Sequence, residues 1–352
     1  MGKISIKNNS FSSAKIFLRD RVGKILKETC YRVNLTNYRL RFPLAACFNV
    51  HTYCNESCIM CPRHTAKKIP TPELMPWPMY EKLLDEFSSK GGQILTFNNF
   101  SEIFAHSKGI DYVLRALSYK NLQVYLVTNG LNLTETYLDR IMSTGFEGII
   151  YVSCHGFSRD TFKKVTRVDG FSIVKENIAK LAQAHLHPER IVVQLIKDYC
   201  SADEIREANN YWQNMGVTVN EMSAHTFCQP GAPADTQSTI KHKLIGCNSW
   251  GHDAGLPFHQ IVIQADGKVT LCCMDVLNSV VLGDAFGSTI DQIWNGREFG
   301  DMLHAIYSGV TPASHSLICN RCPAAVYDDK VRRATTVDIV QLAAANFLSK
   351  RI

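Results

Sequence analysis

The feature that most constrains the fold is a regular alternation of apolar, strand-like segments with helix-like segments between residues 44 and 222. The strand-like runs cover 44–50, 93–98, 122–127, 148–153, 190–196 and 217–222. The helix-like patterns between them cover 77–90, 107–119, 132–144, 158–184 and 202–215. Consecutive βα units favour parallel strands joined by right-handed crossovers. The alternation therefore predicts an α/β fold, either a partial barrel or an open doubly wound sheet.

Three closely spaced cysteines follow the first of these strand-like runs. Cys54, Cys58 and Cys61 are separated by three and then two residues. Loops at the C-terminal ends of parallel barrel strands carry the chemistry of such folds, so the triplet lies where a catalytic metal is expected. Three thiolates can hold a cubane iron–sulfur cluster and leave one iron without a protein ligand. A closed zinc site completed by His64 is the alternative.

A second set of cysteines lies downstream. Its order is Cys247, Cys272, Cys319 and Cys322, with Cys273 next to Cys272 as a possible substitute ligand. The dipeptide at 266–267 is AspGly, which predicts a hairpin turn between short strands, and a helix is expected over 288–307. Four cysteines suit a fully ligated [4Fe–4S] cluster or a structural zinc ion.

Composition places the chain among ordinary globular proteins. Its 352 residues are 45% apolar, and no apolar run reaches the length that spans a bilayer. Thirteen cysteines without a signal-peptide core favour metal ligation in a reducing compartment, so we expect a cytoplasmic protein with no transmembrane segment. Basic and aromatic residues are not interleaved as they are in nucleic-acid-binding proteins, so we do not expect nucleic-acid binding.

Both ends of the chain carry helix-like patterns. Residues 1–42 hold ten basic and two acidic side chains, a net charge of +8, whereas the whole chain carries +6. A helix around 14–26 could pack on the main domain, or dock an acidic partner or a membrane surface. We expect a basic extension at 1–43, a barrel at 44–223, an auxiliary domain at 224–330 and a C-terminal helix at 331–352.

The run from Cys54 to Cys61 resembles the CxxxCxxC signature of radical S-adenosylmethionine (SAM) enzymes, whose fold is a six-stranded partial TIM-like barrel. ThrAsnGly at 128–130 is similar to a common turn of that family. The resemblance implies a [4Fe–4S] cluster whose open iron binds SAM. It also implies SAM contacts from Met60, Ser101, Glu102, Ser153 and Arg167. The chain departs from the family's GGE element, because Phe100 and Ser101 replace its two glycines.

The downstream cysteines resemble the SPASM/Twitch extension of the same superfamily, in the short version with one auxiliary cluster. This resemblance implies a small α+β domain after the barrel and an auxiliary [4Fe–4S] cluster. The implied ligands are Cys247, Cys272, Cys319 and Cys322, and the spacing from Gly267 favours Cys272 over Cys273.

The resemblance implies an oxidoreductase-type enzyme that cleaves SAM to a 5′-deoxyadenosyl radical and removes a hydrogen atom from its substrate. A flavodoxin or ferredoxin would be the reducing partner. Oxidation of the substrate would need a base, and Lys197, Glu221 and His225 are candidates because they lie near the ends of strands five and six. Epimerisation would need a thiol that donates a hydrogen atom, for which Cys154 and Cys228 are candidates.

The substrate class follows less directly. About forty residues precede the first expected barrel strand, which is too few for the leader-binding domain that peptide-modifying relatives often carry. We therefore expect a small hydroxylated molecule, with a ribosomal peptide that is crosslinked or epimerised as the alternative. A non-catalytic iron–sulfur or zinc protein is the third reading, and it would lack SAM contacts.

Overall fold

The computed structural model of the chain describes residues 40–65, 73–97, 101–224, 244–247, 259–275, 278–308, 318–322 and 325–327. The chain divides into two compact units, each built from separate stretches of sequence. One unit combines residues 41–233 with 260–296, and the other combines 1–40, 234–259 and 297–352. The helices expected at 14–26 and 331–352 lie outside the described residues.

The larger unit contains a nine-stranded sheet in the order β10-β9-β8-β1-β2-β3-β4-β5-β6. The first six strands are β1 (Ala45–Phe48), β2 (Ile94–Thr96), β3 (Gln123–Thr128), β4 (Ile150–His155), β5 (Ile191–Ile196) and β6 (Thr218–Met222). Each of these six pairs in parallel with the next along the chain. This sequential parallel order confirms the predicted α/β partial barrel, and every expected strand is present.

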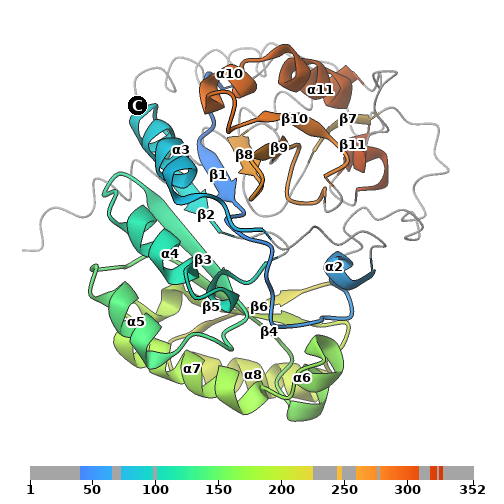
Figure 1. The fold of residues 1–352 in the computed structure, drawn as a ribbon. Helices are drawn as coiled ribbons and strands as arrows, with labels where there is room; N and C mark the ends of the chain where they lie inside the picture. The colour runs from blue at the N-terminus through green and yellow to red at the C-terminus, as the bar shows by residue number, and fades with distance from the viewer. Residues whose placement is uncertain are drawn as a thin grey trace, which may run out of the picture. The chain divides into compact units, whose positions relative to one another are not determined.

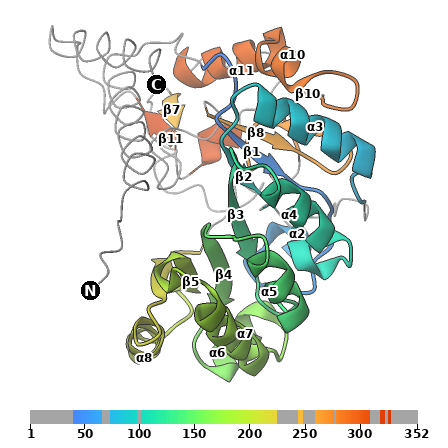
Figure 2. The ribbon, with the colours of Figure 1, turned by 90° about the vertical axis from the view of Figure 1, so that its left-hand side faces the viewer.

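Helices alternate with the six strands, and all of them except the short helix that directly follows Cys61 cover one face of the sheet (Figures 1 and 2). They are α2 (Pro62–Thr65), α3 (Trp77–Ser89), α4 (Gly109–Leu117), α5 (Glu135–Met142), α6 (Arg159–Thr166), α7 (Phe171–Ala184) and α8 (Ala202–Gln213), with short 3₁₀ turns η1 (Ile103–Ala105) and η2 (Pro188–Arg190). Several begin at side-chain caps that the sequence supplies. Thr134, Ser158 and Ser201 each accept a hydrogen bond from a backbone N–H in the first turn of α5, α6 and α8.

One expected helix is two helices in the structure. The pattern at 158–184 is interrupted after α6, where Arg167 adopts the left-handed conformation with φ of 63°. Its backbone N–H bonds back to the Lys163 carbonyl and ends the helix, and α7 begins only after Gly170. The helix expected over 288–307 is likewise divided into α10 (Ile290–Trp294) and α11 (Arg297–Ser308).

Downstream strands complete the same sheet. β8 (Gln260–Ile263) pairs in parallel with β1, while β9 (Lys268–Thr270) and β10 (Val281–Asp284) continue antiparallel. Gly267 has a φ of 86° in the turn between β8 and β9, as the AspGly hairpin predicted. Residues 260–296 therefore lie in the same compact unit as β1 to β6.

The smaller unit contains a separate two-stranded sheet of β7 (Leu244–Cys247) and β11 (Ala325–Tyr327). The helix α11 and the 3₁₀ turn η4 (Ile318–Arg321) both pack on β7. No helix in the parts of the chain that the structure describes is long and apolar enough to cross a membrane.

Candidate metal centre and cofactor site

The cysteine triplet lies on the loop that follows β1, at the C-terminal edge of the parallel strands. Two backbone hydrogen bonds fix this loop to the end of α6: Ser57 N–H donates to the Thr166 carbonyl at 3.1 Å, and Ile59 N–H donates to the Val165 carbonyl at 2.9 Å. A further bond of 3.0 Å closes a turn from Cys61 N–H to the Cys58 carbonyl. The loop is thus held by the βα unit of β4, three units further along the barrel.

The three thiols are shielded from water and interact with one another. Burial raises the pKa of Cys54 to about 11 and raises the pKa of Cys58 and Cys61 as well. The neighbouring thiols add to this rise, Cys61 at Cys54 and both other cysteines at Cys58. Close, buried thiols ionise readily only when a cation compensates them, and soft sulfur ligands suit iron–sulfur clusters or zinc. The donor set therefore fits a soft metal centre.

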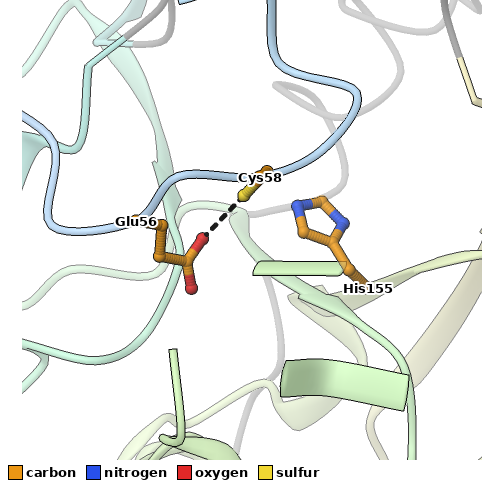
Figure 3. A group of neighbouring side chains, drawn as sticks. All are labelled: Glu56, Cys58 and His155. Atoms are coloured by element: carbon orange, nitrogen blue, oxygen red, sulfur yellow. Dashed lines mark hydrogen bonds between the residues drawn. The ribbon is translucent and has the colours of Figure 1, made fainter. Parts of the chain in front are cut away.

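Two side chains that the sequence analysis did not single out share this site with Cys58 (Figure 3). The Cys58 thiol donates to Glu56 Oε2 at 3.2 Å, and single ligand atoms of Glu56, Cys58 and His155 lie within 4.8 Å of one another. Burial raises the pKa of Glu56 to about 8 and lowers the pKa of His155 to about 4. The signals were present in the sequence, since Glu56 lies inside the cysteine motif and His155 ends the fourth strand.

Glu102 joins the ends of β2 and β3. Its carboxylate accepts hydrogen bonds from the Phe104 N–H at 3.1 Å, the Thr128 hydroxyl at 2.7 Å and the Asn129 N–H at 2.5 Å. Asn129 in turn donates from Nδ2 to Asn55 Oδ1 at 2.7 Å, which connects this network to the cysteine loop. Because the side chain is buried, desolvation raises the pKa of Glu102 to about 7 despite these donors.

Ser101, which replaces a glycine of the GGE element, has a hydrogen bond of its own. Its hydroxyl donates to Asn49 Oδ1 at 2.7 Å, and Asn49 donates from Nδ2 to Gln264 Oε1 at 2.9 Å. Asn49 and Gln264 directly follow β1 and β8, the two adjacent parallel strands. The segment before Glu102 is therefore attached to the edge of the barrel by side chains.

A polar row crosses three strands on the face of the sheet that the helices do not cover. Ser153, Gln194 and Asn220 are register partners on β4, β5 and β6, and the Ser153 hydroxyl donates to Gln194 Oε1 at 3.2 Å. The alternate residues of β4 and β5, such as Val152 and Val193, are fully buried. The remaining expected SAM contacts, Met60 and Arg167, are half-buried and exposed respectively.

The candidate hydrogen-atom donor Cys154 lies on the opposite face from Ser153. It is fully buried and its thiol donates to the Gly156 carbonyl at 3.1 Å, while burial raises its pKa to about 12. A residue on the helix-covered face does not reach the face that carries the polar row. This placement does not favour Cys154 as a donor to substrate.

The candidate bases that the structure describes do not lie together. Glu221 is the register partner of Leu195 and accepts from Asn209 of α8 at 3.2 Å, so it faces the helix layer. Lys197 is exposed just after β5. The candidates His225 and Cys228 lie outside the described residues.

The downstream cysteines belong to both units. Cys247 ends β7, Cys319 lies in η4, and Cys322 donates its backbone N–H to the Cys319 carbonyl at 3.1 Å. Within this smaller unit, β7 contacts η4, which brings the segments of Cys247 and Cys319 together. Cys272 and Cys273 follow β9 in the larger unit, Cys272 buried and Cys273 half-buried.

Two protein-family models match this chain. The model of the radical SAM superfamily matches residues 48–197, and the model described as an iron-sulfur cluster-binding domain, SPASM, matches residues 255–323. A curated relative is the GTP 3',8-cyclase of Lactiplantibacillus plantarum, 23% identical over 226 residues. The match covers 61% of this chain and 63% of that enzyme, so the chain spans less than two thirds of its relative.

Solved structures share the fold at low identity. BtrN in complex with AdoMet and 2-DOIA has a TM-score of 0.53 at 18% identity, covering 76% of this chain and 87% of BtrN. Native anSMEcpe with bound AdoMet and Kp18Cys peptide has a TM-score of 0.54 at 12% identity, covering 87% of this chain and 97% of anSMEcpe.

Both family matches fall on the predicted cysteine sets. The first includes Cys54, Cys58 and Cys61, and the second includes Cys272, Cys319 and Cys322. Together they imply a SAM-binding [4Fe–4S] cluster and an auxiliary iron–sulfur cluster, and they favour iron over the zinc alternatives. The chain belongs to the radical SAM superfamily and carries a SPASM iron–sulfur domain.

Proposed function

We propose that this protein uses SAM to remove a hydrogen atom from a small hydroxylated molecule, which is then oxidised or epimerised. The proposal depends above all on two observations: the cysteine loop directly follows β1, and the polar row of Ser153, Gln194 and Asn220 lies on the face of β4, β5 and β6 that the helices do not cover. Amide side chains such as those of Gln194 and Asn220 are groups that can orient a hydroxylated ligand, while Ser153 of the same row is proposed to contact SAM.

Individual residues have distinct proposed roles. Cys54, Cys58 and Cys61 would hold the cluster that, with SAM, supplies a 5′-deoxyadenosyl radical. Glu102 and Ser101, each fixed by its own hydrogen bonds, would orient the methionine part of SAM, while Ser153 and Arg167 would contact its ribose and carboxylate. Met60 would contact SAM from the cysteine loop. Cys247, Cys272, Cys319 and Cys322 would hold the auxiliary cluster, a candidate acceptor for the second electron of an oxidation.

The fold alone does not select the substrate class. Structures of similar fold hold 2-DOIA in BtrN and the Kp18Cys peptide in anSMEcpe. The polar row favours a small molecule here, and a ribosomal peptide is the second candidate. A flavodoxin or ferredoxin as electron donor remains part of the proposal.

The test uses full-length protein reconstituted anaerobically with iron and sulfide, then supplied with SAM and a strong reductant. Aminocyclitols, other hydroxylated small molecules and peptides are added separately, and 5′-deoxyadenosine is measured above the background without substrate. Mass spectrometry in D₂O separates oxidation, which lowers the product mass by about two hydrogens, from epimerisation, which adds deuterium without other change. Cys58→Ala serves as the inactive control.

Stimulation by a small hydroxylated compound, together with a raised KM in Gln194→Ala and Asn220→Ala, would support the proposal. Stimulation by peptides alone would replace it with the peptide alternative. Protein with full cluster content that never releases 5′-deoxyadenosine above background with any of these classes would refute it.

A further inference from the structure

Strand β4 ends irregularly at His155. The pairing of β4 with β5 shifts register between Ser153 and His155, which is a β-bulge. His155 also adopts a left-handed backbone conformation with φ of 60°, which is uncommon for a residue other than glycine. Bulges redirect a side chain and are frequent beside active sites. The backbone at this position therefore keeps an unfavourable conformation that determines where the imidazole points.

The imidazole points toward Cys58 (Figure 3). One of its ring nitrogens lies within 4.8 Å of both the Cys58 sulfur and a Glu56 carboxylate oxygen. The nitrogen that faces Cys58 in Figure 3 is the one farther from Cβ, Nε2. The other nitrogen, Nδ1, is buried and has no hydrogen-bond partner among the residues that the structure describes.

The unpartnered Nδ1 determines which nitrogen carries the proton. A proton on Nδ1 of the neutral ring would be a buried donor without an acceptor, which is less favourable than a buried acceptor without a donor. The neutral ring therefore keeps its proton on Nε2, and a protonated ring has one there as well. In either state Nε2 is a hydrogen-bond donor directed at Cys58.

Cys58 changes from a hydrogen-bond donor to an acceptor when it binds iron. In the present structure its thiol donates to Glu56 at 3.2 Å. A ligating thiolate has no proton to donate, so the hydrogen bond from Cys58 to Glu56 is lost and the sulfur can only accept. Among the three grouped side chains, His155 is the one with an N–H.

We propose that His155 is a positioning residue for the SAM-binding cluster, and that its Nε2–H donates a hydrogen bond to the Cys58 sulfur. This inference rests on the proposed function only in that Cys54, Cys58 and Cys61 hold the cluster. Hydrogen bonds to the sulfurs of an iron–sulfur cluster withdraw negative charge and raise its reduction potential. His155 thus makes the cluster easier to reduce.

A matched pair of variants tests the role. His155→Gln keeps an N–H that can reach the place of Nε2, while His155→Leu removes it, and neither side chain is branched at Cβ. His187→Leu is the control, because His187 is an exposed histidine beside Glu189, at the start of η2. Each reconstituted holoenzyme is analysed for iron and sulfide and titrated electrochemically. EPR follows the reduced signal that changes on adding SAM.

At full cluster content, we expect His155→Leu to show an about tenfold lower ratio of reduced to oxidised cluster at a fixed solution potential. For one electron this corresponds to a midpoint about 59 mV more negative. His155→Gln should recover most of the difference, and His187→Leu should match the unaltered protein. A His155→Leu cluster with the unaltered midpoint potential and EPR signal would overturn the proposal.

If His155→Leu takes up an incomplete cluster, its potential cannot be compared, and the measurement on His155→Gln tests the proposal. Full cluster content with a near-unaltered potential in that variant supports the hydrogen bond. Loss of cluster in both variants overturns it, since the shape of the imidazole would then be what the site requires. These measurements need no substrate and stand apart from the substrate class. An unaltered protein that takes up no cluster at all would instead refute the proposed function.

Discussion

Replacing Glu102 with glutamine should change how the stability of the cluster-free protein depends on pH. The Glu102 carboxylate is 4% exposed, and its pKa is raised from 4.5 to about 7, chiefly by burial. Between these values the unfolded chain has lost the proton and the folded chain retains it. The folded state then binds more protons, so stability falls as pH rises from 4.5 to 7 and is constant above that range.

The size of the effect follows from the shift. A difference of about 2.5 pKa units at 1.36 kcal/mol per unit corresponds to about 3 kcal/mol, most of it lost between pH 5 and pH 8. Glutamine cannot ionise, so the Glu102→Gln variant does not lose this stability as the pH rises. Its Oε1 can still accept from Phe104 and Thr128, but its NH₂ group faces the Asn129 N–H, which costs about 1–3 kcal/mol at every pH.

We therefore expect Glu102→Gln to be less stable than the unaltered protein at pH 5, and this gap to shrink by about 2–3 kcal/mol by pH 8. Urea unfolding under reducing, anaerobic conditions measures it. His51 and His155 have pKa values lowered to about 4, so they contribute stability that grows as pH rises from 4 towards 6.5. This opposite slope cancels in the difference between the two proteins.

Glu176→Gln is the matched control, because Glu176 is exposed and pairs with Lys180 on the surface of α7. Its stability difference from the unaltered protein should change with pH by less than about 0.5 kcal/mol. A Glu102→Gln gap that is equally constant across the range would refute the reasoning, because Glu102 would then ionise in the folded state as it does in the unfolded chain.

Three further predictions concern single residues. Cys58→Ala should lower the iron content by about four atoms per chain and leave the auxiliary cluster, whereas Cys200→Ala, at a half-buried cysteine outside both sets, should keep about eight; iron analysis decides, and equal iron in the two variants would contradict the ligand assignment. Gly109→Ala should destabilise by about 3 kcal/mol or more, because its Cβ would lie 1.7 Å from the Ile103 carbonyl oxygen; urea unfolding measures this, and a shift below 1 kcal/mol would show that the turn relaxes freely. Arg167→Gly should stabilise the cluster-free protein by up to about 1 kcal/mol, since φ is 63° there, while weakening SAM binding to the reconstituted protein; unaltered SAM affinity by calorimetry would remove Arg167 from the site.

The barrel strands could be predicted from sequence because each is a short apolar run between breakers. Local patterns did not reveal the break within 158–184, since it depends on Arg167 adopting a conformation that glycine normally provides. They also did not reveal that β8 pairs with β1. That contact joins Ala46 to Ile261, more than two hundred residues apart, and no local periodicity encodes it.

Some residues of the candidate site could likewise be predicted from the sequence, and others could not. The position of the cysteine loop follows from strand order alone, so Cys54, Cys58 and Cys61 could be placed in advance. Strand alternation could also have separated Ser153 from Cys154, because successive residues of a strand point to opposite faces. The place of His155 at the end of the fourth strand could be read from the sequence, but its approach to Cys58 depends on a β-bulge and a positive φ that the residue type does not specify.

Part of the segment that the SPASM model matches lies in the same compact unit as the barrel strands. The SPASM match begins at residue 255, yet residues 260–296 belong to the same compact unit as β1 to β6. The Glu86 carboxylate of α3 accepts hydrogen bonds from the Ile290 and Asp291 N–H groups at the start of α10, at 2.9 and 3.0 Å. Gln264 accepts from Asn49 beside the site.

Hydrogen bonds connect residues of the radical SAM match with a residue of the SPASM match. The Asn49 side chain that receives the Ser101 hydrogen bond is itself held by Gln264, so the segment that leads into Glu102 is oriented through a residue of the SPASM match. Side-chain networks of this kind hold their members more rigidly than isolated pairs do. Ser101 is therefore held, through Asn49, by a residue that directly follows β8, the strand paired beside β1.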